Sequence, residues 1–85
     1  MRDGEGFRAE IKVGKKVHWI LLATHSGVGP RAEMHDAKSG KKIAETAWAQ
    51  DLGDAKKKAE EFGRRWYAAV GLKKPFPALD WEPTG

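Results

Sequence analysis

The chain of 85 residues contains no cysteine. This absence excludes a disulfide framework, and it removes thiolate metal ligands and a cysteine nucleophile from the candidate chemistries. Long apolar runs are also missing, because the longest, residues 19–23, is far shorter than the ~20 residues of a membrane-spanning helix. No charged and then apolar signal segment opens the chain. We therefore expect a cytoplasmic protein with no membrane contact.

Charge of both signs is plentiful, with an excess of positive charge. Sixteen Lys and Arg residues against twelve Asp and Glu residues give a net charge of +4, a balance that favours polyanionic partners. A chain of this length can form only one small core, so we expect a single domain over residues 7–71. A disordered lead-in, residues 1–6, precedes it. An irregular tail, residues 72–85, follows and packs on the domain, since it combines prolines with apolar side chains.

One stretch, residues 51–70, has the periodicity of an amphipathic helix. Apolar side chains recur there at steps of three and four, and charged side chains occupy the opposite side. The apolar stripe consists of Leu52, Ala55, Ala59, Phe62, Trp66 and Ala69. Asp51 or Asp54 is expected to cap the helix start, and Gly71 to end the helix.

Strand patterns precede this helix. The expected strands span residues 7–13, 17–24, 32–37 and 42–49. Residues 38–41 are typical of a tight turn and residues 25–31 of a loop. Because short turns make neighbouring strands pair, the pattern predicts an α+β fold, with an antiparallel β-meander of three or four strands and the C-terminal helix packed on one face. Ile20 and Leu22 would lie on the second face, where the tail is one candidate cover.

Three lysines, Lys56, Lys57 and Lys58, lie in the first turns of the expected helix. The helix dipole disfavours cations there, and lysines beside free amide groups form a site suited to a phosphate. The alternative is a solvated helix face on which Lys56 pairs with Glu60 and Lys57 with Glu61.

The same region carries a resemblance to a known family. Glycine and two lysines lead into a strand, and a second run opens the helix. These runs are Gly40, Lys41, Lys42 and then Gly53, Asp54, Ala55, Lys56, Lys57, Lys58, Ala59. They resemble the last strand and final helix of double-stranded-RNA-binding domains, over roughly the third quarter of the chain and without the N-terminal helix of that family. The resemblance implies that Lys56, Lys57 and Lys58 contact phosphates across a groove.

A second basic surface follows from the expected connectivity. In an up-and-down meander the turn with Lys15 and Lys16 lies at the same end as the turn with Lys38, Lys41 and Lys42. A helix running back along the sheet would add further cations at that end, namely Arg64, Arg65, Lys73 and Lys74. The alternative is that these side chains only keep the protein soluble and discourage association of sheet edges.

Other chemistry has little support in the sequence. The three histidines, His18, His25 and His35, lack the spacing of a metal site, and Ser26 and Ser39 have no base placed beside them. We therefore expect no enzymatic activity, no metal or cofactor and no small-molecule substrate.

The sequence favours a small nonenzymatic domain that binds DNA or RNA through backbone phosphates with little base specificity. The candidate binding residues are Lys15, Lys16, Lys38, Lys41, Lys42, Lys56, Lys57, Lys58, Arg64 and Arg65. The alternative is a protein interaction module, or a homodimer, that uses the second face of the sheet.

Overall fold

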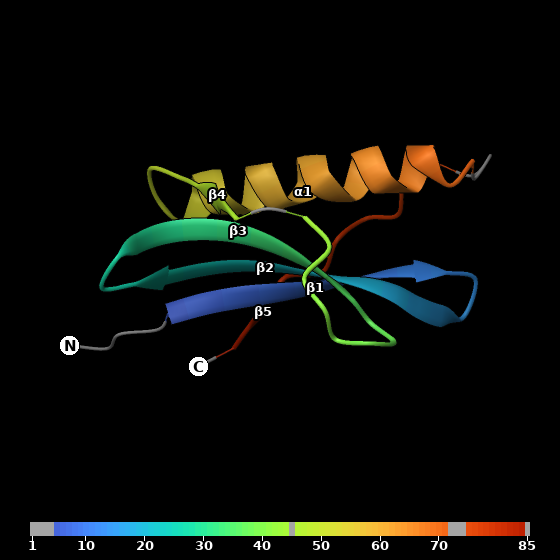
Figure 1. The fold of residues 1–85 in the computed structure, drawn as a ribbon, viewed down its shortest axis with the longest axis horizontal. Coiled ribbons are helices and arrows are strands. Elements are labelled where there is room, and N and C mark those ends of the chain that lie inside the picture. The colour runs from blue at the N-terminus through green and yellow to red at the C-terminus, as the bar shows by residue number, and fades with distance from the viewer. Residues whose placement is uncertain (1–4, 45, 72–74, 85) are drawn as a thin grey trace.

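The protein is a two-layer α+β domain in which one helix lies across one face of an antiparallel sheet (Figure 1). The computed structural model describes residues 5–44, 46–71 and 75–84. In these residues the sheet has five strands in the order β4-β3-β2-β1-β5. The strands are β1 Glu5–Val13, β2 Lys16–Ser26, β3 Gly29–Asp36, β4 Ala47–Trp48 and β5 Glu82–Pro83, and the helix is α1 Leu52–Ala69. The predicted fold class, a meander followed by a C-terminal helix, is confirmed.

The hairpin between β2 and β3 is tighter than predicted. His25 pairs with Pro30 and Ser26 with Gly29, so only two residues form the turn. The predicted loop over residues 25–31 is therefore wrong. Proline is tolerated here because it stands at the beginning of β3, where a missing N–H removes little from the ladder. β1 likewise begins at Glu5, inside the predicted lead-in, and residues 1–4 lie outside the described residues.

The predicted fourth strand over residues 42–49 is mostly irregular. One bridge joins Lys42 to His35, and β4 contains two residues. Three apolar residues of this segment, Ile43, Ala44 and Ala47, pack against the core. A regular strand would send the side chains of two adjacent residues to opposite faces, so burying both Ile43 and Ala44 requires the chain to leave strand geometry.

The buried face of the helix consists of three small residues and one tyrosine. Ala55, Ala59, Gly63 and Tyr67 are buried, whereas Phe62 and Trp66 pack against the core from half-buried positions and Ala69 is exposed. The predicted stripe is thus correct at the two alanines, lies at the margin of the core at Phe62 and Trp66, and is wrong at Ala69. Small side chains at steps of four let α1 lie close to Ile11, Leu21 and Met34, the three largest fully buried side chains of the sheet. Asp51 caps the helix, with its carboxylate accepting from the Asp54 amide at 2.7 Å.

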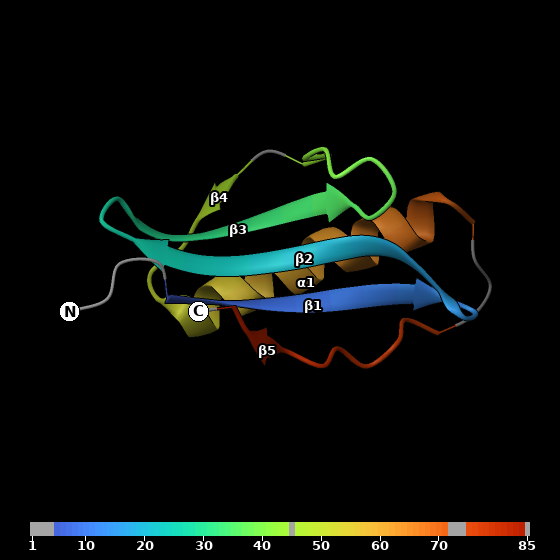
Figure 2. The ribbon, with the colours of Figure 1, turned by 90° about the horizontal axis from the view of Figure 1, so that it is seen from below.

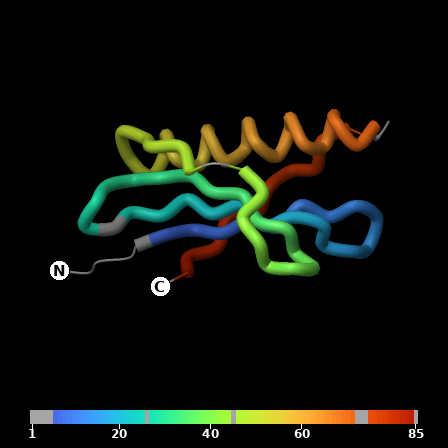
Figure 3. The backbone as a smooth tube through the Cα atoms, in the orientation of Figure 1, coloured from blue at the N-terminus to red at the C-terminus, as the bar shows by residue number. Residues whose placement is uncertain are grey.

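The C-terminal segment passes from the helix layer to the sheet layer (Figure 3) and runs along the β1 edge of the sheet (Figure 2). Phe76 meets Tyr67 edge to face, with ring centroids 5.5 Å apart, and Leu79 and Trp81 pack against the core. β5 then pairs with β1 through Glu82 and Pro83. The tail therefore closes the flank between helix and sheet, and it does not cover the face that carries Ile20 and Leu22 (Figure 2).

Candidate nucleic-acid interface

Two separate turns place lysines at one end of the sheet (Figure 2). Lys15 lies in the turn between β1 and β2, Lys16 begins β2, and Lys38 and Lys41 belong to the loop after β3. Lys16 and Lys38 line the same surface hollow, together with Val17, His18 and Asp36. We call the set Lys15, Lys16, Lys38 and Lys41 the lysine end. The structure thus brings together the two turns that connectivity predicted to share an end.

Asp36 holds the loop of the lysine end in a closed turn. Its carboxylate accepts from the Ser39 amide at 2.8 Å, and its backbone carbonyl accepts from the Gly40 amide at 2.8 Å. Gly40 supplies the positive φ of 76° that the turn requires. The hydrogen bond from the Ser39 amide holds the pKa of Asp36 below its ordinary value. Among the described residues that line this hollow, Asp36 is the only carboxylate, and it is engaged with the loop backbone.

Lys42 does not join the lysine end. Its Nζ donates to Thr46 Oγ1 at 3.0 Å, four residues further along the chain. By contrast, Lys15, Lys16, Lys38 and Lys41 are exposed and form no ion pair within 4.0 Å with any residue that the structure describes. Lys38 also attracts the Asp36 carboxylate and contributes to the lowered pKa of that group. The ammonium groups remain accessible to a ligand.

The lysines at the helix start have local partners. Lys58 pairs with Asp54 at 3.7 Å, and Lys56 Nζ lies 3.7 Å from the centroid of the Phe7 ring. The expected pairs of Lys56 with Glu60 and Lys57 with Glu61 are not the ones that form. The two pairs found on the described helix, Asp54 with Lys58 and Glu60 with Arg64, place the acid first, which is the more favourable order.

The helix arginines lie on opposite flanks of α1. Arg64 binds Glu60 at 3.2 Å and stacks 4.8 Å from the Phe76 ring centroid, beside the tail. Arg65 lines a hollow with Ile43 and Trp66, beside the segment that leads to β4. The loop of the lysine end lies on the other side of the sheet from the helix (Figure 1). The two arginines therefore do not join the lysines, and Lys73 and Lys74 lie outside the described residues.

Sequence reasoning missed the polar side chains on the sheet face opposite α1. Arg8 pairs with Glu10 and Arg31 with Glu33, each at 3.5 Å. The period-two pattern of β1 and β3 is the sequence signal that places Arg8 and Arg31 on this face.

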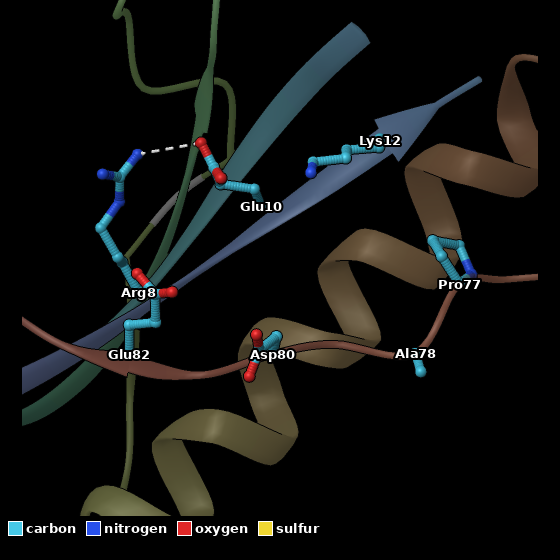
Figure 4. Close-up of a pocket in the computed structure, with 7 residues that line it drawn as sticks. All are labelled: Arg8, Glu10, Lys12, Pro77, Ala78, Asp80 and Glu82. Carbon is cyan, nitrogen blue, oxygen red and sulfur yellow. Dashed lines mark hydrogen bonds and ion pairs between the residues drawn. The ribbon is translucent and has the colours of Figure 1, made fainter. Parts of the chain in front are cut away.

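Arg8 and Glu10 also line a groove of about 230 Å³ between β1 and the tail, with Lys12, Pro77, Ala78, Asp80 and Glu82 (Figure 4). Its three carboxylates against two cations make it unsuited to a polyanion.

No group of three or more histidine, aspartate or glutamate side chains suited to a metal ion occurs within residues 5–44, 46–71 and 75–84. In the same residues no helix is long and apolar enough to cross a membrane. Comparison of the chain with protein families, curated proteins and solved structures gave no match.

Proposed function

We propose that this protein is a nonenzymatic nucleic-acid-binding domain that contacts backbone phosphates at the lysine end. The observation that carries the proposal is that two separate turns bring exposed lysines to one hollow, with no ion pair to any described residue. A cytoplasmic location is consistent with the absence of cysteine from the sequence.

Exposed lysines that form no close ion pair favour a polyphosphate over an isolated anion. Each lysine ammonium is a point charge on a flexible stem, so it can follow a phosphate backbone without demanding one geometry. Neutralising phosphates releases condensed counterions, which supplies most of the free energy of nonspecific binding. Among the described residues that line the hollow of the lysine end there is no arginine fork, and the aromatic ring there is the imidazole of His18. We therefore expect little discrimination among sequences.

The helix start is the weaker of the two predicted surfaces. A phosphate bound there would compete with Asp54 for Lys58 and with the Phe7 ring for Lys56. Only Lys57 is exposed without such a contact within the described residues. The two lysine sets therefore provide a test in which one serves as the control for the other.

The experiment measures fluorescence anisotropy of labelled duplex DNA and duplex RNA at several salt concentrations. The variants replace lysine with glutamine, either at positions 15, 16, 38 and 41 or at positions 56, 57 and 58. Loss of the lysine end should lower the slope of log affinity against log salt by about 0.9 for each DNA phosphate contact removed. The helix-start variant should keep most of the wild-type slope. Equal losses, a larger loss in the helix-start variant, or no binding of the wild-type protein at low salt would contradict the proposal.

A further inference from the structure

The face of the sheet opposite α1 carries an ordered grid of side chains, which we call the open face. Leu22 of β2 lies between Arg8 of β1 and Glu33 of β3, as their Cα pairing shows. In the next row Ile20 lies between Glu10 and His35. Figure 2 looks onto this face, and none of the described helices and strands crosses the three long strands. The loop after β3 projects on this side of the sheet, beside the end of β3 (Figure 1). Two apolar side chains thus form a short ridge between charged columns.

We propose that a second copy of this chain packs on the open face. The charge pattern carries the proposal, because cation and acid alternate along β1, where Arg8, Glu10 and Lys12 follow one another on this face. Half a turn about an axis between the rows of Arg8 and Glu10 sets each Arg8 against a Glu10, as an isologous two-fold contact requires. On β3 the same rotation sets Glu33 against His35. A polyanion or a uniformly charged partner would meet repulsion from half of the same side chains.

A two-fold axis in the contact plane has two simple orientations. With the axis along β2, Arg8 would meet Glu33 of the second copy, and both lysine ends would lie together. With the axis across the strands, between the rows of Ile20 and Leu22, Arg8 would meet Glu10 of the second copy and Leu22 would meet Ile20. The lysine ends would then lie at opposite ends of the pair. Repulsion between two sets of four lysines favours the arrangement with the axis across the strands.

The size of the face sets the strength of the contact. Four rows of side chains at about 6.8 Å each and three long strands at about 4.8 Å each cover about 400 Å² per copy. Two copies would bury about 800 Å², which is below the area of stable specific interfaces and in the range of weak, transient contacts. With only two central apolar side chains per copy, the pair should form weakly and reversibly, so its population should rise with protein concentration.

The first experiment is sedimentation of the full chain over a wide concentration range. The wild-type protein should shift from monomer towards dimer, and Leu22→Glu should raise the dissociation constant by at least about tenfold, since it places a charge on the ridge. Val28→Glu is the matched control, because Val28 is 73% exposed in the turn between β2 and β3 and lies outside the grid. Circular dichroism reports whether each variant is folded. A wild-type protein that remains monomeric, or an equal effect of both variants, would overturn the proposal.

A charge exchange tests the arrangement without altering the apolar ridge. Arg8→Glu should weaken the dimer, and Arg8→Glu combined with Glu10→Arg should restore it. Glu82 lies beside position 8. It repels the new glutamate equally in the single and the double variant, so this repulsion does not affect the comparison of their dimer affinities. Restoration by Glu33→Arg instead of Glu10→Arg would overturn the axis across the strands, and no restoration by either would overturn the paired-charge contact. Glutamine at the four positions of the lysine end should leave dimerisation unweakened, which separates this inference from nucleic-acid binding.

Discussion

Gly63 is a point of close approach between the helix and the sheet. A Cβ placed on it would lie 2.7 Å from Cδ1 of Ile11, 3.1 Å from Cζ of Phe76 and 3.3 Å from Cδ1 of Leu21. Ile11 and Leu21 are fully buried and have no free space into which to move. The absence of a side chain at position 63 therefore determines how deeply α1 is seated on the sheet.

We expect Gly63→Ala to destabilise the protein although alanine is the better helix former. The helical preference of alanine would contribute about 1 kcal/mol, whereas overpacking a closed core costs about 1–3 kcal/mol. Gly53→Ala is the control for helical preference, since the atom nearest to its Cβ is the capping oxygen Oδ1 of Asp51, at 3.3 Å and on an exposed side chain rather than in the core. Chemical denaturation should show a loss only for position 63. An equal or greater stability of Gly63→Ala would mean that the core can relax around the methyl group.

Tyr67, and not Trp66, is the aromatic side chain of α1 that the core depends on most. Tyr67 is 6% exposed and contacts the rings of Trp19 and Phe76, with centroids 6.5 Å and 5.5 Å away. We expect Tyr67→Ala to cost about 3–5 kcal/mol, and Trp66→Ala, from a half-buried position, about 1–3 kcal/mol. Urea unfolding of the two variants measures the order. A larger loss of stability for Trp66→Ala would mean that the helix packs on the sheet through the stripe predicted from the sequence, which includes Trp66.

At the scale of the elements, periodicity predicted the type of each main segment. Alternation located β1, β2 and β3, and steps of three and four located α1. Periodicity did not fix which side of the helix faces the sheet, because two apolar stripes compete. One is the aromatic stripe of Phe62 and Trp66, and the other is the row of small residues that ends at Tyr67. The sheet surface packs more closely against the smaller side chains, so the row of small residues faces it. The shape of that surface cannot be read from the sequence of the helix.

The loop of the lysine end depends on one carboxylate. Because the folded pKa of Asp36 is lowered by the Ser39 amide, the stabilisation of the turn is fully present above the ordinary aspartate pKa. It is lost as the pH falls through the lowered folded value. An NMR titration should therefore show the Ser39 amide signal shifting with a midpoint below that of a free aspartate. Asp36→Asn should abolish this response. A midpoint at or above the free value would contradict the hydrogen bond.

At the scale of the whole molecule, connectivity was the most informative guide to the candidate site. An up-and-down meander requires the β1–β2 turn and the loop after β3 to share one end, and they do (Figure 2). The same reasoning failed for Arg64 and Arg65. Helix length alone places them near that end, but the thickness of the sheet separates them from the lysine loop (Figure 1). Which side of the sheet a loop folds towards depends on strand twist and on contacts such as that of His35 with the Gly40 carbonyl, at 3.3 Å.

The tail completes the core at the flank where the helix overhangs β1. Phe76, Leu79 and Trp81 pack against the core cluster, while β5 adds only two paired residues at the sheet edge. Deleting residues 75–85 should therefore cost about 3–5 kcal/mol, a large share of the 5–15 kcal/mol that stabilises a typical domain. Deleting only residues 82–85 should cost much less, because the three apolar side chains remain. Thermal unfolding of the two truncated chains measures the difference. If both melt close to the full chain, the tail contacts do not stabilise the domain, and the flank of Tyr67 is closed by some other rearrangement.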